Sequence, residues 1–124
     1  MTTIGVGVDE VDEPRFALAL ERHPRLLTRL FTEGERLDAR LRPERLAARF
    51  AAKEAVLKTL HVGIGGAPWH SIEIHRSSDG VPSVELHGVA LELAERRGVR
   101  HLHVSMTHTA LTAAAFVVGL DERG

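Results

Sequence analysis

The sequence contains two carboxylates and an ammonium group that could form one functional site. Asp9 closes a short apolar run at residues 4–9, and Glu54 and Lys58 lie four residues apart in a long helical segment. Carboxylates from two separate elements can bind a hard divalent ion such as Mg²⁺, which takes one or two protein carboxylates, retains waters and accepts phosphate oxygens. Alanines share the helix face of Glu54 and Lys58, and they would leave a shallow floor for a polar ligand.

Each of these residues also has a simpler interpretation. Asp9 suits a strand-terminal turn or a helix cap, and Glu54 with Lys58 suits an exposed i,i+4 ion pair worth about 0.2–0.5 kcal/mol. Spacing alone favours the ion pair. Lys53 is different, because it falls inside an apolar stripe that extends about 40° to either side of Leu46 on the helical wheel. The stripe is formed by Leu46, Phe50, Leu57 and Leu60.

The chain has eight histidines, which raise the possibility of a metal site. His101 and His103 would share one face of a strand, but no third ligand stands at a diagnostic spacing, so the pattern favours solvated histidines over structural zinc. His108 follows Ser105 in what reads as a polar turn between two apolar strands. Such a supported turn is a common place for a catalytic residue.

The segments that must position these residues are a strand and a helix. Residues 4–9 alternate with period two, so Gly5, Gly7 and Asp9 share one face of the expected strand. Glycines beside a carboxylate leave room for a ligand or another backbone. Residues 43–60 are expected to be helical, because the segment holds no glycine and no proline after its first residue.

The remaining pattern predicts an α+β fold, with an antiparallel sheet and the long helix packed against it, in one domain over residues 1–124. Asp12 is expected to cap a helix over residues 14–22, and Thr32 with Glu35 has the spacing of a capping box. Gly98 should close a helix over residues 89–97. Strands are expected at residues 70–75, 81–87, 99–106 and 110–118, the first two joined near residues 79–80.

Arginines recur early in the chain, at positions 15, 22, 25 and 29. They fall within about 80° on a helical wheel if the proline at position 24 permits one continuous helix. A row of this kind is usually a solvated face. It would also suit docking of an acidic helix or a phosphate, because the positive charge is concentrated there.

Composition excludes several classes of protein. The chain lacks cysteine, so disulfides and thiolate catalysis are excluded. Sixteen basic and seventeen acidic residues give a formal charge of −1, which argues against a nucleic-acid partner. No apolar run has the roughly 18 residues of a membrane span, and the start shows no signal peptide. We therefore expect a cytoplasmic protein with no membrane partner.

Three segments together resemble one family. They are residues 5–9 (GVGVD), residues 49–55 (RFAAKEA) followed by Lys58, and residues 104–109 (VSMTHT). In this order they closely resemble the holo-acyl-carrier-protein synthases, the short bacterial-type phosphopantetheinyl transferases. The stretches LFT at residues 30–32 with Glu35, and GIGG at residues 63–66 before Trp69, extend the resemblance to nearly the whole chain.

The resemblance implies transfer of the 4′-phosphopantetheine arm of coenzyme A to a serine of an apo acyl carrier protein, with release of adenosine 3′,5′-bisphosphate. It leaves open whether that carrier serves fatty-acid or polyketide synthesis. It also implies a homotrimer with sites between neighbouring subunits. Mg²⁺ would hold the pyrophosphate, with a bound water as base for the carrier serine.

The resemblance also implies residue roles. Asp9 and Glu54 match the magnesium ligands, and together with Lys58 and His108 they form the implied catalytic set. Coenzyme A would be bound by Arg49, Lys58, Ser105 and His108. Arg15 corresponds to an arginine that receives acidic side chains of the carrier protein, with Arg22 as a second candidate.

The sequence departs from the family pattern in a few places. His61 and Val62 stand where glycine and threonine are usual, and Glu10 follows Asp9 where an apolar residue is common. A bulky His61 could reshape the coenzyme A pocket. Two other interpretations therefore stay open: a catalytically weakened relative that only binds carrier protein or coenzyme A, and a small nucleotide- or metal-binding trimer.

Overall fold

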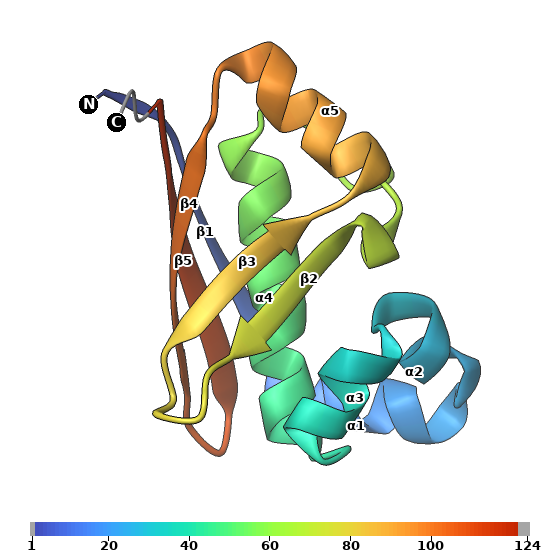
Figure 1. Cartoon of the computed structure of the whole chain (residues 1–124). Coiled ribbons are helices and arrows are strands. Elements are labelled where there is room, and N and C mark those ends of the chain that lie inside the picture. The colour runs from blue at the N-terminus through green and yellow to red at the C-terminus, as the bar shows by residue number, and fades with distance from the viewer. Residues whose placement is uncertain (1, 122–124) are drawn as a thin grey trace.

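The first and last strands of the chain pair with each other in the larger sheet. A computed structural model describes residues 2–121, and it shows an antiparallel three-stranded sheet in the order β1–β5–β4 and a separate β2–β3 hairpin (Figure 1). The strands are β1 (Thr3–Asp12), β2 (Ile72–Arg76), β3 (Pro82–Leu86), β4 (His101–His108) and β5 (Thr112–Leu120). The predicted α+β class with antiparallel strands is confirmed.

Helix α4 (Pro43–Thr59) runs between the two sheets. Its buried face contacts the three-stranded sheet through Ala55 and Val56, and the same core cluster contains Ile72 and Ile74 from the hairpin. This arrangement confirms the long helix predicted from residue 43 onward. It also explains why α4 is rich in alanine, because small side chains let both sheets approach the helix closely.

The two glycines of β1 let this strand pack closely against the backbone of helix α4. A Cβ atom placed on Gly7 would lie 2.0 Å from the backbone oxygen of Ala55, and one on Gly5 would lie 2.4 Å from that of Thr59. Of the two uses expected for these glycines, a ligand or another backbone, the structure shows the second. Asp9, on the same face of β1, is thereby held beside the helix.

The other helices are α1 (Glu13–Arg22), α2 (Arg25–Leu30), α3 (Glu33–Ala39) and α5 (Gly88–Arg97), with a 3₁₀ turn at Trp69–Ser71. The predicted caps are present. Asp12 accepts a hydrogen bond from the Arg15 N–H, Thr32 and Glu35 form the reciprocal capping box, and Gly98 adopts a left-handed φ of 77° after α5. Among the described residues, no helix is long and apolar enough to cross a membrane.

The boundaries of the later strands differ from the prediction by about two residues. Strands β4 and β5 were expected at 99–106 and 110–118, but Val99 closes helix α5 by donating to the Ala94 carbonyl, and the turn between the strands lies at residues 109–111. There Thr109 accepts hydrogen bonds from the backbone of Leu111 and Thr112. His108 is therefore the last residue of a strand rather than part of the turn.

The face of the three-stranded sheet that points away from α4 is uncovered in the single chain. Val6 and Val8 are 55% and 60% exposed, and Phe116, which pairs with Val8, is 47% exposed. Ser105 of β4 pairs with Phe116 of β5, and the Ser105 side chain is also exposed. This apolar face, formed by Val6, Val8 and Phe116, is called the outer sheet face below.

Candidate functional site

The structure brings Asp9, Glu54 and Lys58 together where β1 passes α4. The Lys58 ammonium donates to an Asp9 carboxylate oxygen at 3.1 Å and to the Val8 carbonyl at 2.9 Å. Asp9 is mostly covered, whereas Lys58 is exposed. The predicted i,i+4 pair thus turns toward a strand rather than lying isolated on a helix surface.

Glu54 is half-buried beside Asp9, and this environment disfavours its charge. Burial, together with the charge and hydrogen bonding of Asp9, raises the pKa of Glu54 to about 7 against the opposing effect of Lys58. The Lys58 ammonium pairs with Asp9, and Glu54 lies beside that pair, so an ionised Glu54 gives the site an excess of negative charge. The donor set of this site therefore suits a hard cation that binds carboxylate oxygens.

This pKa predicts that Glu54 destabilises the metal-free fold at high pH. Because the folded pKa is about 7, above the ordinary 4.5, stability is lost as the pH rises through that interval. Glu54→Gln should stabilise the protein by about 1–2 kcal/mol at pH 8, after discounting for partial exposure, and by almost nothing at pH 4. Urea unfolding in EDTA measures both values.

The matched control is Glu92→Gln, which removes an exposed carboxylate from α5. It should change the free energy of unfolding by less than about 0.5 kcal/mol at either pH. An equal effect of Glu54→Gln at both pH values would contradict the raised pKa.

A second group of predicted residues lines a cavity of about 330 Å³ between the first half of α4 and the end of β4. Arg49 and His108 both line it, together with Arg45, Arg76 and Thr107. The Arg49 guanidinium is bound on one side by Asp38 at 2.6 Å, while its Nε is buried and has no hydrogen-bond partner among the described residues. The cavity is thus lined by several cationic side chains and is suited to an anionic ligand.

The two groups do not meet within one chain. Nine positions separate Arg49 from Lys58, which places their side chains about 180° apart around α4 at 3.6 residues per turn. None of Asp9, Glu54 and Lys58 lines the cavity of Arg49 and His108. Ser105 belongs to neither group, because its side chain lies on the side of the outer sheet face.

The arginine row of the sequence is divided between two helices. Helix α1 ends at Arg22 and α2 begins at Arg25, with Pro24 between them, so the condition for a single wheel over positions 15–29 is not met. Arg15 and Arg22 do share one helix. With Leu18, Ala19 and His23 they line an open depression of about 230 Å³.

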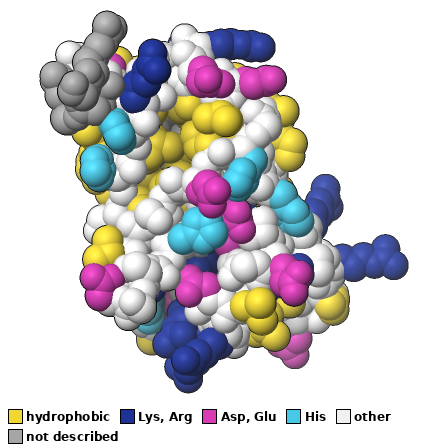
Figure 2. Space-filling view, in the orientation of Figure 1, with side chains coloured by type: hydrophobic (Ala, Val, Ile, Leu, Met, Phe, Trp, Pro, Cys, Tyr) yellow, Lys and Arg dark blue, Asp and Glu magenta, His cyan; other side chains and the backbone are white. Residues whose placement is uncertain are grey.

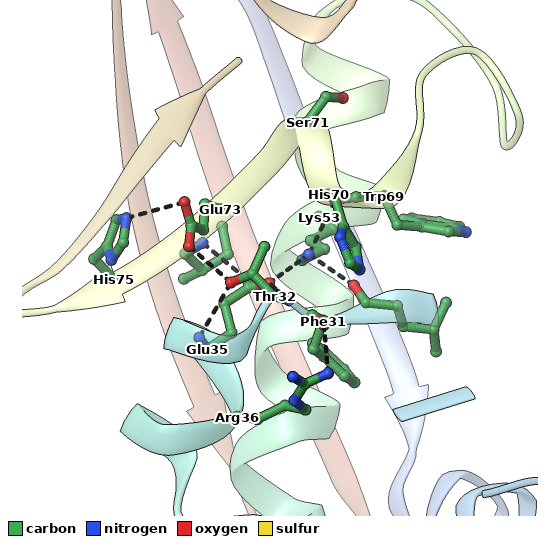
Figure 3. Close-up of polar contacts among 12 residues, drawn as sticks. Phe31, Thr32, Glu35, Arg36, Lys53, Trp69, His70, Ser71, Glu73 and His75 are labelled. Carbon is green, nitrogen blue, oxygen red and sulfur yellow. Dashed lines mark hydrogen bonds and ion pairs between the residues drawn. The ribbon is translucent and has the colours of Figure 1, made fainter. Parts of the chain in front are cut away.

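Lys53 has a structural partner that the sequence did not reveal. Its ammonium lies 2.6 Å from a Glu35 carboxylate oxygen, with both side chains fully buried, and it donates to the carbonyls of Leu30 and Trp69 (Figure 3). Glu35 also accepts from the backbone of Thr32 and Ile74. This buried pair connects α3, α4 and β2. Sequence reasoning assigned Glu35 a role as a capping residue and a place in the family resemblance, but not as the partner of Lys53, and it performs the capping role as well.

Other residues were missed by sequence reasoning. Arg45, Arg76 and Thr107 line the cavity of Arg49 and His108 but were not singled out. Arg45 lies four positions before Arg49 on the same helix, a spacing that could have found it. Arg76 comes from the distant β2 strand, and no local signal connects it to the cavity.

His61 occupies a strained position just after α4. Its φ is 61°, in the left-handed region that glycine adopts without strain, and its N–H donates to the Lys58 carbonyl. Its ring lies close to Gly5, four residues before Asp9 on β1. The departure noted in the sequence thus falls at the end of the helix that carries Glu54 and Lys58.

Comparison with known proteins shows the family. Residues 5–116 match the family model of the 4′-phosphopantetheinyl transferase superfamily. A holo-[acyl-carrier-protein] synthase of Clavibacter michiganensis subsp. michiganensis is 50% identical over 115 residues, covering 92% of this chain and 92% of that protein. The chain therefore belongs to the 4′-phosphopantetheinyl transferase superfamily.

Solved structures agree with this assignment. The ACPS–CoA complex of Chronobacterium ammoniagenes superposes with a TM-score of 0.84 at 29% identity, covering 99% of this chain and 100% of that chain. The holo-[acyl-carrier-protein] synthase of Helicobacter pylori in complex with coenzyme A has a TM-score of 0.84 at 28% identity, covering 93% and 99%. Within the superfamily, the chain groups with the holo-[acyl-carrier-protein] synthases, which confirms the resemblance found in its sequence.

Proposed function

We propose that this protein transfers the 4′-phosphopantetheine arm of coenzyme A to a serine of an apo acyl carrier protein, using Mg²⁺. The observation that carries the proposal is the meeting of Asp9, Glu54 and Lys58 at one point of a fold shared with coenzyme A complexes. In the reaction, the serine oxygen bonds to the phosphorus next to pantetheine and the bridging P–O bond breaks. Adenosine 3′,5′-bisphosphate leaves.

The residues at this point fit magnesium. Asp9 and Glu54 are hard oxygen donors from two elements, and the open side of the site leaves room for water and phosphate ligands. When bound there, the ion supplies charge neutralisation for the pyrophosphate. Asp9 and Glu54 would hold it, and Lys58 would contact the phosphate oxygens and stabilise the negative charge on the departing group.

One assay tests the function. The purified chain is incubated with Mg²⁺, coenzyme A and an apo acyl carrier protein, and the intact mass of the carrier is measured. We expect a gain equal to one phosphopantetheine arm. An unchanged carrier that forms a detectable complex would instead indicate the weakened, binding-only relative. If the carrier is neither modified nor bound, a small nucleotide- or metal-binding protein is favoured.

We further propose a homotrimer whose active sites lie between neighbouring subunits. Two observations support it. Lys58 lies on the opposite side of α4 from Arg49 and His108, so these predicted coenzyme A contacts fall in two groups. The outer sheet face, with Ser105 beside it, exposes Val6, Val8 and Phe116, which a neighbouring copy would cover. In such an assembly, Arg49 and His108 of one copy would meet coenzyme A held by Asp9, Glu54 and Lys58 of the next. The expected cytoplasmic location also stays a prediction.

Mixing two inactive variants tests the shared site. Asp9→Ala and His108→Ala should each be nearly inactive alone, because each removes one half of the site. Chains carrying different tags are co-expressed and the mixed oligomers are purified. We expect transfer to recover in the mixed oligomers, since some interfaces then combine two intact halves.

The control is a double variant that carries both substitutions in one chain, mixed with itself. It should show no recovery. If mixed oligomers form, as native mass spectrometry shows, and still have no activity, the two groups do not act across an interface.

The depression lined by Arg15 and Arg22 is our proposed docking place for the carrier protein. Two arginines flank the exposed Leu18, so the surface suits an acidic segment with an apolar contact. Arg15→Glu should weaken carrier binding by about tenfold or more, because a like charge would then face the acidic partner. Titration calorimetry with carrier protein measures the affinity.

Coenzyme A affinity should change little in this variant. The matched control is Arg97→Glu, which makes the same charge change at an exposed position near the end of α5. Normal carrier affinity in Arg15→Glu, or an equal loss in both variants, would place docking elsewhere.

A further inference from the structure

Four potential metal ligands gather on the solvent-facing side of the β2–β3 hairpin. Glu73 and His75 lie two positions apart on β2. Glu85 lies on β3, and His87 directly follows the end of that strand. The residues between them point into the core or pack against it: Ile72, Ile74, Val84 and Leu86. The four polar side chains therefore share one face, where Figure 2 shows histidine and acidic side chains next to one another.

The donor atoms of these side chains lie close together. His87 Nε2 is 3.0 Å from a Glu73 oxygen and 3.9 Å from a Glu85 oxygen, and the donor atoms of these three residues all lie within 4.8 Å of one another. His75 Nε2 is 2.8 Å from a Glu85 oxygen. It is also 3.6 Å from a Glu73 oxygen, a contact that Figure 3 shows. Ligands of a tetrahedral zinc ion, at bond lengths of about 2.0–2.2 Å, are about 3.4 Å apart. The observed separations bracket this value.

The backbone register itself brings the two glutamates together. Glu73 and Glu85 are directly opposite in the hairpin, a pairing of like charges that destabilises a strand pair on its own. Glu73 is also fixed from outside the hairpin, because Thr32 Oγ1 donates to its second oxygen at 2.7 Å. A ligand whose orientation is set by such an outer hydrogen bond is a common feature of metal sites.

We propose that this face of the hairpin binds a first-row divalent transition-metal ion, with Glu73, Glu85 and His87 as ligands. His75, which contacts both glutamates, would become the fourth ligand by turning its ring toward the ion. Two imidazoles among two carboxylates favour zinc, cobalt or nickel over magnesium, which prefers oxygen ligands alone. The site is thus chemically distinct from the pair Asp9 and Glu54. It is independent of the proposed function.

Binding here would connect the hairpin to the helical part of the molecule. Thr32 is the N-cap of α3 and donates to Glu73, and the Glu35 of the same capping box bonds to Ile74 and Lys53. An ion on the hairpin would therefore stabilise the contact between β2 and α3. We expect added Zn²⁺ to raise the melting temperature.

Titration of the full chain with Zn²⁺ tests the site. The protein is treated with a chelator, exchanged into excess Mg²⁺ to occupy the carboxylate pair, and titrated calorimetrically. We expect one Zn²⁺ per chain. His75→Ala/His87→Ala should weaken binding by on the order of 100-fold or more, because it removes ligands rather than their outer partners.

The matched control is His101→Ala/His103→Ala, which removes the two same-face histidines of β4. It should bind Zn²⁺ like the wild type. Co²⁺ gives a second reading, since the absorption of a tetrahedral complex should appear in the wild type and the control and be lost in His75→Ala/His87→Ala.

Three results would overturn the proposal: no stoichiometric Zn²⁺ binding by the wild type, unchanged binding by the His75/His87 variant, or loss of binding in the β4 control instead. Circular dichroism checks that each variant is folded. Carrier modification in Mg²⁺ should proceed normally in the His75/His87 variant, so failure of this site would leave the proposed transfer activity untouched.

Discussion

Asp9→Asn should lower the rate of carrier modification by on the order of 10³-fold at ordinary Mg²⁺ concentrations. The substitution keeps the shape of the side chain but removes one of the two carboxylates that would hold the ion. Metal stabilisation of a transferring phosphoryl group contributes several kcal/mol, and each 1.36 kcal/mol corresponds to about tenfold in rate. Initial rates of carrier mass gain, measured across Mg²⁺ concentrations, give the effect.

Glu92→Gln is the control for this prediction. Glu92 is an exposed carboxylate on α5, outside both groups of site residues and outside the outer sheet face. Its replacement should leave the rate within about twofold, as expected for an exposed group outside the site. Near-normal turnover by a folded Asp9→Asn variant would rule out the proposed metal site.

Lys53→Met should lower the free energy of unfolding by about 3–5 kcal/mol. The substitution fills a similar volume but leaves the Glu35 carboxylate buried without its cation, and breaking one side of a buried ion pair costs roughly that amount. It also leaves the carbonyls of Leu30 and Trp69 without their donor. Urea denaturation monitored by circular dichroism measures the loss.

Lys58→Met gives the contrasting result on the same helix. Lys58 is exposed and its ion pair with Asp9 is partly solvated, so stability should change by about 1 kcal/mol or less while transfer is slowed. A loss below about 1 kcal/mol in Lys53→Met would mean that the buried pair is not the connection described here.

Features encoded by neighbouring residues were predictable from sequence. The caps at Asp12, Thr32 and Gly98 each depend on residues within a few positions, and all three are present. Strand boundaries were less well predicted, because the hydrogen bonds that define them are made with distant segments. Val99 reads as a strand residue by its type, yet its backbone closes α5.

The candidate site was partly accessible to sequence reasoning. Resemblance to a family placed Asp9, Glu54 and Lys58 in one site, whereas spacing alone favoured a plain ion pair. The anomaly of Lys53 in an apolar stripe was visible, but its partner Glu35 was not, because it lies on another helix and had a sufficient local role. The nine-residue spacing already places Arg49 and Lys58 on opposite sides of a helix. The cavity around Arg49 could not be predicted in this way, because Arg76 and His108 reach it from distant strands.

The glycines of β1 also limit how this protein can evolve. Any side chain at position 7 would collide with the Ala55 backbone and push the strand from the helix, which would widen the gap between Asp9 and Glu54. A substitution that alters no reacting group would thus misalign the two carboxylates. In a mutational library selected for activity, position 7 should be as intolerant as position 9, and for a steric rather than a chemical reason.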